Sequence, residues 1–285
     1  MSLSVTTGPD HVFTAPSGAV LRLMPERSAW CPQTDTLYVA DLHLGKAATF
    51  RARGLPVPQG TTTETLERLT QAVRRSGARE LVVLGDLLHA RESHACGTLS
   101  ALARWRDAHP GLRCSVVMGN HDRHAGALDA SLGFETLADR HLGVHWIGVH
   151  EAAGSPRCAD PAGADPRLIL AGHLHPVTWV RGRADRLRLP CFWLCEHVLT
   201  LPAFGAFTGG HHVDTPGTRA FIVADRVMAG GGRVTGVITD HLMKPEVAHH
   251  GIDELVVVAD MSERKRVMID RADAFLTLPG GVGTM

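Results

Sequence analysis

The 285-residue sequence has neither an excess of charge of one sign nor a long apolar run. Lys and Arg number 29 and Asp and Glu number 29, so the formal net charge is zero. This balance argues against a polybasic protein that wraps nucleic acid or an anionic membrane, although it leaves room for a local basic groove. No apolar stretch approaches the roughly 20 residues that cross a bilayer. The first ten residues also lack the basic and apolar regions of a secretory signal.

Cysteine and aromatic residues are sparse as well. The six cysteines are scattered and form no CxxC pair, which argues against a disulfide framework or a cysteine zinc site and fits a reducing cytoplasm. With 5% aromatic residues, the chain offers little platform for stacking nucleic-acid bases. By contrast, 18 histidines make a metal site built from neutral imidazoles the first site to look for. Hydrophobic residues, at 44%, still suffice for a sizeable core.

Apolar runs alternate with helical periodicity in the first half of the chain. Four runs are near-continuously apolar, as expected for strands buried on both faces: 36–40, 81–84, 114–118 and 168–171. Helical spacing of leucines predicts helices over residues 61–76 and around 99–105. The alternation predicts an α/β domain with helices layered on a sheet. From Val177 onward, β-like stretches with turn signals predict strands that complete a second sheet.

A polar motif closes each of these apolar runs. The four motifs are Asp41-Leu42-His43, Gly85-Asp86, Gly119-Asn120-His121-Asp122 and Gly172-His173-Leu174-His175. Ligand sites in α/β sheets gather at the carboxyl ends of strands, so we expect the motifs to meet. Residues i and i+2 of an extended chain point to one side, so Asp41 with His43, and His173 with His175, could each hold one ion. The preceding glycines are expected to let the backbone turn tightly.

The ligand types predict a two-metal centre. Carboxylate, imidazole and amide oxygen together suit Mn²⁺, Fe²⁺ or Zn²⁺. Two such ions, roughly 3.5–4 Å apart, can clamp a phosphate and provide a metal-bound hydroxide for in-line attack on phosphorus. Asp86 is the candidate bridging ligand because a carboxylate has two oxygens. His121, next to the ligand Asn120, is the candidate to protonate the leaving oxygen, and Asp122 could orient its imidazole.

The order of the motifs resembles the calcineurin-like metallophosphoesterase superfamily, whose pattern is D-x-H, G-D, G-N-H-D/E, H and G-H-x-H. This resemblance implies a four-layer α/β/β/α sandwich and adds one ligand, His150, in Gly148-Val149-His150-Glu151. It further implies that one ion is held by Asp41, His43, Asp86 and His175. The other ion would be held by Asp86, Asn120, His150 and His173. His121 would then act on the substrate.

Two further segments, Tyr38–Lys46 and Leu201–Gly210, look like the bacterial ligase-associated DNA damage response endonuclease family, PdeM. The similarity runs from about Arg22 to Met228. It implies a metal-dependent phosphodiesterase or nuclease of the cytoplasm, with manganese the expected metal, that acts in DNA repair beside a DNA ligase and a helicase. Single-stranded DNA would then be a substrate, but the residues themselves leave a mononucleotide or a cyclic nucleotide open.

Basic residues near the motifs are candidates for binding substrate phosphate. Lys46 and Arg51 follow the first motif and could bind phosphate, as could Asn120, although a solvated loop is the alternative for the two basic residues. A basic hairpin over residues 181–188, ending in Arg188, could follow a nucleic-acid backbone, but arginines alternating along an exposed strand are common. Three further histidines near the motifs are expected to be ordinary exposed or hydrogen-bonded side chains: His89, His94 and His124.

Residues 229–285 form a predicted second domain after a phosphoesterase domain at 1–228. A strand is predicted at 234–238, a helix opening at 263–265, and a strand at 274–278 that leads into the loop Pro279–Thr284. Arg264 and this PGGVGT loop resemble the LOG family, the cytokinin-riboside-monophosphate phosphoribohydrolases, which implies a partial Rossmann-like segment. The early glycine-rich loop and the glutamate after PGGxGT are absent, so we expect a truncated fusion with little activity of its own.

Two alternatives to a phosphoesterase remain. The tail could work as a LOG-like nucleotide phosphoribohydrolase, but the catalytic carboxylate of that family is missing. The protein could instead be a non-catalytic scaffold that binds a repair helicase, which the complete ligand set disfavours. The phosphoesterase is therefore the preferred interpretation.

Overall fold

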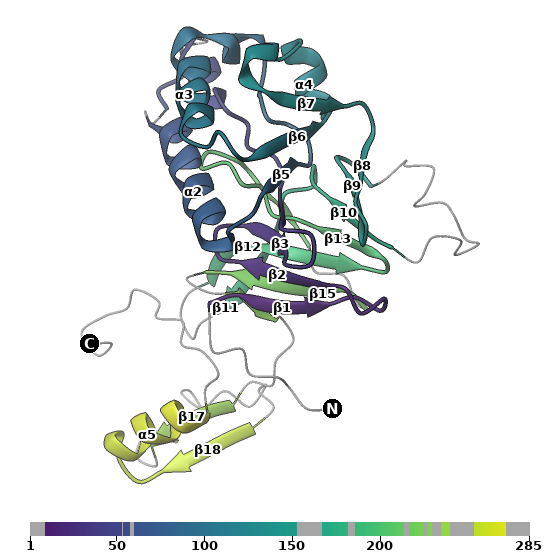
Figure 1. Ribbon diagram of the computed structural model, residues 1–285. Helices are drawn as coiled ribbons and strands as arrows, with labels where there is room; N and C mark the ends of the chain where they lie inside the picture. The colour runs from purple at the N-terminus through teal and green to yellow at the C-terminus, as the bar shows by residue number, and fades with distance from the viewer. Residues whose placement is uncertain are drawn as a thin grey trace. The chain divides into compact units, whose positions relative to one another are not determined.

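The computed structural model describes residues 9–52, 54–57, 60–152, 167–181, 186–213, 217–224, 227–229, 235–239 and 254–271. The chain divides into a larger unit, Thr6–Met228, and a smaller unit that includes Ala229–Met285 (Figure 1). The strand predicted at 274–278 and the PGGVGT loop lie outside the described residues.

The first sheet of the larger unit has the order β1-β2-β3-β4-β5-β6-β7. Its strands are β1 His11–Thr14, β2 Val20–Met24, β3 Ser28–Cys31, β4 Thr36–Val39, β5 Glu80–Val83, β6 Arg113–Val117 and β7 Phe134–Leu137. Strands β1 to β4 are antiparallel and β4 to β7 are parallel. Parallel neighbours need long crossovers, and helices α2 (Thr61–Ser76) and α3 (Cys96–Asp107) provide two of them.

The second sheet has the order β14-β11-β12-β13-β10-β9-β8, and β15 and β16 extend it from β12. Its strands are β8 Arg140–Leu142, β9 Trp146–Val149, β10 Leu168–Ala171, β11 Pro176–Arg181, β12 Arg186–Cys195, β13 Val198–Thr200, β14 His211–His212, β15 Arg219–Val223 and β16 Val227–Ala229. Strands β9, β10 and β13 run parallel beside one another. Shorter elements of this unit are helices α1 (Lys46–Ala52) and α4 (Asn120–Ala125) and the 3₁₀ turns Arg91–His94 and Ala130–Leu132.

Alternate residues of the central strands belong to different cores. In β4, Leu37 joins the cluster under α2 and α3, whereas Tyr38 joins the cluster between the two sheets. In β10, Leu170 faces the same inter-sheet cluster and Ile169 joins a small cluster on the opposite face. The predicted strands buried on both faces are thereby confirmed, as is the α/β sandwich of two sheets.

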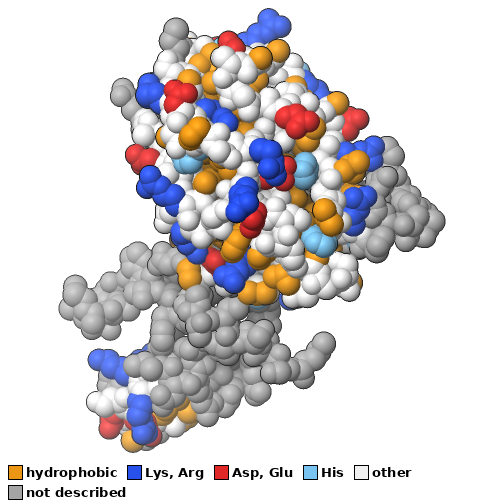
Figure 2. Space-filling model, viewed as in Figure 1, with side chains coloured by type: hydrophobic (Ala, Val, Ile, Leu, Met, Phe, Trp, Pro, Cys, Tyr) orange, Lys and Arg blue, Asp and Glu red, His pale blue; other side chains and the backbone are white. Residues whose placement is uncertain are grey.

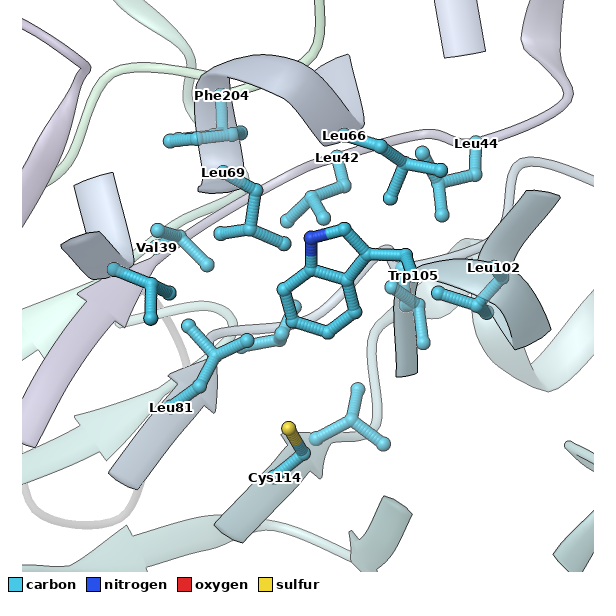
Figure 3. Packing of buried hydrophobic residues seen from close by; sticks show 14 of the residues in the cluster. Val39, Leu42, Leu44, Leu66, Leu69, Leu81, Leu102, Trp105, Cys114 and Phe204 are labelled. Atoms are coloured by element: carbon cyan, nitrogen blue, oxygen red, sulfur yellow. The ribbon is translucent and has the colours of Figure 1, made fainter. Parts of the chain in front are cut away.

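Trp105 of α3 anchors the cluster between the helices and the first sheet. Its indole lies among leucines of both helices and of the sheet, with Phe204 nearby (Figure 3). The ring is 6% exposed, and its Nε1–H donates to Oγ1 of Thr70 in α2 at 3.1 Å. One side chain thus holds α2, α3 and the sheet together, and the polar atom of the indole is satisfied.

We expect Trp105→Ala to lower the free energy of unfolding of the larger unit by about 3–5 kcal/mol, because it opens a large cavity in a packed core. Trp105→Phe keeps most of the packing and should cost clearly less. Urea denaturation followed by circular dichroism measures both values. Equal losses in the two variants would show that the Thr70 hydrogen bond, and not the packing, dominates.

The smaller unit contains two parallel strands and one helix in its described residues. Strand β17 (Thr235–Thr239) pairs with β18 (Glu254–Val258), and α5 (Met261–Arg271) follows. Asp260 accepts from the backbone N–H of Glu263 at 2.8 Å, and the Glu263 carboxylate accepts from the N–H of Ala259 at 2.9 Å. These reciprocal contacts cap α5 at its start, two residues before the predicted position.

The visible surface carries basic and acidic side chains interspersed over the larger unit (Figure 2). This mixture agrees with the zero net charge of the sequence. In the described residues, no helix is both long and apolar enough to cross a membrane.

Candidate functional site

The strand order brings the motif residues to one edge of each sheet. Asp41 follows β4, Asp86 follows β5 and Asn120 begins α4 after β6, and these strands are parallel neighbours. His150 follows β9 and His173 follows β10, which are parallel neighbours in the second sheet. Because the carboxyl ends of parallel neighbours share an edge, side chains far apart in sequence meet there.

Asp41, His43 and His175 form the first group of side chains that could hold a metal ion. Nε2 of His175 lies 3.3 Å from Nε2 of His43 and 3.5 Å from Oδ1 of Asp41. Asp41 is 0% exposed, and in the described part of the chain its Oδ1 has no hydrogen-bond partner. Burying a charged oxygen without a partner costs free energy unless a cation lies beside it. Oδ1 of Asp41 therefore suits the role of a metal ligand. Burial, and next the His175 imidazole, lower the pKa of His43 far below its usual range and keep that ring neutral.

Asp86, His150 and His173 form the second group, and Asn120 lies within it. Oδ1 of Asn120 is 2.9 Å from Nε2 of His150 and 3.1 Å from Nδ1 of His173. Nδ1 of His150 lies 3.0 Å from the carbonyl oxygen of Leu84, which assigns the proton of the neutral ring to Nδ1. The lone pair on Nε2 therefore faces the amide oxygen of Asn120. A cation between these two atoms would stabilise the arrangement.

Asp86, a member of the second group, also faces the first group. Its Oδ2 is 3.8 Å from Nε2 of His43, and its Oδ1 is 3.6 Å from Nε2 of His150. Oδ1 also accepts a hydrogen bond of 2.9 Å from the backbone N–H of His121. Burial raises the pKa of Asp86; His150 opposes this shift and Asp41 adds to it. A carboxylate with one oxygen toward each group has the geometry of a bridging ligand, and bound cations would compensate its buried charge.

The loops that carry the candidate metal-binding side chains have a turned and not an extended backbone. Asp41, His43, Asp86, His173 and His175 have left-handed backbone conformations, with φ between 46° and 67°. Such conformations cost non-glycine residues about 1–3 kcal/mol each and gather at functional sites. The i, i+2 argument for an extended chain therefore fails for His173 and His175, which the structure places in different groups. Asp41 and His43 do share a group, but through turned backbone.

His121 lies beside the first group, and the backbone holds its ring. Its Nδ1 is 2.8 Å from the carbonyl oxygen of His89, which leaves Nε2 as the nitrogen available for proton transfer. The ring stacks on His89 with centroids 4.6 Å apart and meets His43 edge-on at 4.9 Å. The side chains of His43, His89 and His121 are close enough to form a third metal-binding group.

Asp122 makes different contacts from those expected. Its carboxylate accepts from the backbone N–H of Leu88 at 2.9 Å and from that of Gly119 at 3.1 Å. Burial raises the pKa of Asp122, and these backbone hydrogen bonds partly oppose the shift. Asp122 thus ties the loop after β5 to the start of α4, and the contact that orients the His121 ring comes from the His89 carbonyl instead.

His89 is the site residue that the sequence interpretation left as an ordinary histidine. Its Nδ1 lies 3.4 Å from Nδ1 of His43, and its ring packs against both His43 and His121. Its position three residues after Asp86, on the same strand-end loop, was the available signal. A single histidine at that spacing is too common to identify without the fold.

Lys46 and Arg51 occupy different positions relative to the two groups. Lys46 begins α1 and is half-buried; burial lowers its pKa, while Asp86 and Asp41 raise it. The charges of Asp86 and Asp41 therefore act on the Lys46 ammonium, which keeps Lys46 a candidate for binding phosphate. Arg51, in the last turn of α1, is exposed.

The segment Leu201–Gly210 supports the first ligand loop. The backbone N–H of Phe204 donates to the carbonyl of Ala40 at 2.8 Å, and that of Gly205 donates to the carbonyl of Asp41 at 3.1 Å. Arg68 of α2 in turn donates to the carbonyl of Phe204 at 2.6 Å. The segment thereby fixes the turned backbone at Asp41 from outside the sheet.

Gly85 and Gly119 are required for different reasons. Gly85 has φ +83°, and a Cβ there would lie 2.0 Å from Nδ1 of His150. Gly119 has an extended backbone, with φ −83° and ψ 172°, and its Cβ would lie 2.1 Å from Oδ1 of Asp86. The predicted tight turn therefore explains Gly85, whereas Gly119 is needed because the carboxylate of Asp86 passes close to it.

We expect Gly85→Ala to lower the free energy of unfolding by more than about 2 kcal/mol, since it combines backbone strain with overlap on His150. Gly97→Ala in α3 is the matched control, because a Cβ there meets nothing within 4 Å. It should be neutral or stabilising by up to about 1 kcal/mol. Urea titration measures both, and equal stability of the two variants would contradict the packing around His150.

Comparison with known proteins finds two separate similarities. The solved structure of Pseudomonas putida nuclease MPE is 36% identical to this chain, covers 77% of it and 99% of that protein, and superimposes with a TM-score of 0.64. Residues 221–285 match the family described as possible lysine decarboxylase.

The second similarity extends to curated relatives. The cytokinin riboside 5'-monophosphate phosphoribohydrolase of Mycobacterium marinum is 52% identical over 77 residues, and that of Mycobacterium tuberculosis is 49% identical over 77 residues. Each alignment covers 27% of this chain and 39% of the relative. The chain thus spans about two fifths of the length of these relatives.

Proposed function

Because the chain belongs to the calcineurin-like metallophosphoesterase family, we propose that its larger unit is a two-metal phosphoesterase that hydrolyses phosphodiester bonds. The observation that carries the proposal is the position of Asp86. Its two oxygens lie 3.8 Å and 3.6 Å from imidazole nitrogens of the first and second groups. Two groups of metal-binding side chains joined by one carboxylate fit a pair of neighbouring cations.

The side chains present fit such ions. One ion would be held by Asp41, His43, Asp86 and His175, and the other by Asp86, Asn120, His150 and His173. Two observations support this assignment. Oδ1 of Asp41 has no hydrogen-bond partner among the described residues, and lone pairs of Asn120 and His150 face each other. When bound, two divalent ions polarise the phosphoryl oxygens and activate water as the nucleophile.

His121 and Lys46 would act on the substrate itself. With Nδ1 of His121 bonded to the His89 carbonyl, a protonated ring can donate from Nε2 to the leaving oxygen. Lys46, on whose ammonium the charges of Asp86 and Asp41 act, would bind a non-bridging phosphate oxygen and neutralise part of its charge.

Several finer assignments are part of this proposal. A nuclease role is supported by the similarity to the Pseudomonas putida nuclease MPE. Manganese as the native metal, single-stranded DNA as the substrate, a cytoplasmic role in DNA repair, and association with a DNA ligase and a helicase stay predictions from the family resemblance. The candidate ligand set of carboxylate, imidazole and amide oxygen suits borderline divalent cations such as Mn²⁺.

The test is metal-dependent hydrolysis of bis-p-nitrophenyl phosphate by the full chain. Activity should be absent after EDTA treatment and return with Mn²⁺, and its recovery with Fe²⁺ or Zn²⁺ ranks the metals. Labelled single-stranded DNA incubated with Mn²⁺ should give shortened products. If the protein binds the metal but hydrolyses neither substrate, the result would support the alternative of a non-catalytic scaffold.

The tail offers a second candidate activity with weaker support. Its similarity to cytokinin riboside 5'-monophosphate phosphoribohydrolases covers 39% of those proteins. Arg264 lies in α5, whereas the PGGVGT loop lies outside the described residues. Release of free base from a nucleoside monophosphate by the full chain would establish this activity, and we expect none.

A further inference from the structure

A small cavity of about 180 Å³ adjoins the first ligand group on the side of the second sheet. Its lining includes His175, Arg27, Arg188, Thr208 and Gly209. Pockets that enclose a whole small-molecule ligand have volumes of roughly 300–1,000 Å³, so this cavity suits one chemical group of a larger substrate. A metal-binding residue and two arginines therefore share one small, polar pocket.

Arg27 reaches this pocket from the turn between β2 and β3. Its Nη1 lies 3.3 Å from the carbonyl oxygen of Ala203 and 3.5 Å from that of Gly205. These acceptors hold the guanidinium in place but carry no charge to cancel it. Burial, and next the repulsion from Arg68, lower the pKa of Arg27 to about 10, so the side chain stays positive at neutral pH.

Arg188 reaches the pocket from the second sheet. It lies on β12 opposite Trp179, it is exposed, and its Nη2–H donates to the carbonyl of Gly210. A Cβ at Gly210 would lie 2.3 Å from Val177, so only glycine lets the loop pass this close to β11. Among the residues that the structure describes, no carboxylate forms an ion pair with Arg188 or Arg27. Glu64, whose charge raises the pKa of Arg27, pairs with Arg68 at 3.0 Å.

We propose that this pocket binds a second phosphate of the substrate strand, next to the phosphodiester that is hydrolysed. Two arginines without carboxylate partners form a site for an anion, and guanidinium groups suit phosphate because they can donate two hydrogen bonds at once. The inference rests on the proposed phosphodiesterase function and names its substrate class as an oligonucleotide with at least two phosphates. It also explains how a chain of zero net charge can bind nucleic acid through a local basic pocket.

The test compares substrates with one and two phosphates. The wild type, Arg188→Gln and Arg27→Gln are assayed with Mn²⁺ on bis-p-nitrophenyl phosphate, a dinucleotide and a trinucleotide. Each substitution should lower the ratio of kcat/KM for the trinucleotide to that for bis-p-nitrophenyl phosphate by about tenfold, the effect of losing one charge-assisted phosphate contact. Arg113→Gln, an exposed arginine at the far end of β6, is the matched control and should keep the wild-type ratio.

A binding measurement provides a readout that does not depend on turnover. Fluorescence anisotropy of a labelled oligothymidylate in EDTA gives the dissociation constant at several salt concentrations. Loss of one phosphate contact should reduce the slope of log affinity against log salt by about 0.7 for a single strand. Arg113→Gln should leave this slope at the wild-type value.

The outcomes separate this inference from the proposed function. Wild-type ratios and salt slopes in both variants would overturn the inference while bis-p-nitrophenyl phosphate hydrolysis continued to support the phosphodiesterase. No hydrolysis of any substrate by the wild type would refute the proposed function, and the salt slopes would still decide whether the pocket binds a strand. If inorganic phosphate inhibits the wild type but not Arg188→Gln, while the trinucleotide ratio is unchanged, the pocket binds free phosphate and the strand assignment is wrong. If Arg27→Gln lowers the melting temperature, the kinetic ratio and the salt slope of Arg188→Gln alone test the inference.

Discussion

Replacing Asp86 with asparagine should reduce bis-p-nitrophenyl phosphate hydrolysis by about a thousandfold or more, because it removes the charge of the residue placed between both ion sites. The side chain keeps its size, and its oxygen can still accept the 2.9 Å hydrogen bond from the His121 N–H. The loss should therefore come from metal binding. Steady-state kinetics with Mn²⁺, together with a metal count by mass spectrometry, measures both effects.

The stability of the same variant provides an independent check. Burial raises the pKa of Asp86, and Asp41 adds to the shift, so the charged form is disfavoured without metal. Metal-free Asp86→Asn should then unfold at a temperature no lower than the wild type, and it should lose the rise that Mn²⁺ produces in the wild type. Asp139→Asn, an exposed aspartate after β7, is the control and should keep that rise. An Mn²⁺-dependent rise of normal size in Asp86→Asn would contradict the bridging role.

The second large effect is expected for His121→Ala, and it should depend on the leaving group. Cleavage of a DNA strand expels an alkoxide, which needs a proton, so this variant should lose about 10²- to 10⁴-fold in rate. p-Nitrophenolate is a far weaker base and can leave unprotonated, so the loss on bis-p-nitrophenyl phosphate should be much smaller. Assays of both substrates at saturating Mn²⁺ measure the difference.

His145→Ala is the matched control for this prediction. His145 is a half-buried histidine in the turn before β9, outside all three groups of metal-binding side chains. It should retain both activities. Equal losses on the two substrates in His121→Ala would show that His121 acts through metal binding or structure, and that another group protonates the leaving oxygen.

The sequence allowed the main strands and both long crossover helices to be predicted because their signals are local. The run 36–40 reads as a strand because its residues are apolar on both faces, and the structure places Leu37 and Tyr38 in opposite cores. The antiparallel strands β1 to β3 were not predicted. Their sequence mixes polar and apolar residues over short lengths, which fits several local structures equally well.

The candidate site was likewise predictable only in part. The motif residues could be named from sequence because strand ends in α/β sheets converge, whichever residues lie between them. The roles of Asp122 and His89 could not, since they depend on which backbone groups lie within hydrogen-bond distance. The i, i+2 spacing also failed to predict that His173 and His175 belong to different groups, because left-handed turns replace the expected extended backbone.

The order of residues along the chain was enough to predict two sheets and to name most of the candidate metal-binding side chains at their strand ends, although His89 was not among them. Periodicity and residue chemistry act over a few neighbouring positions, so they can be read directly. Only the tertiary structure decided that a carbonyl of His89 orients His121, and that Arg27 and Arg188 share a pocket with His175. Arg27 and Arg188 are 161 positions apart in the chain, and no local pattern encodes their meeting; the packing of the two sheets and the turns at their ends creates it.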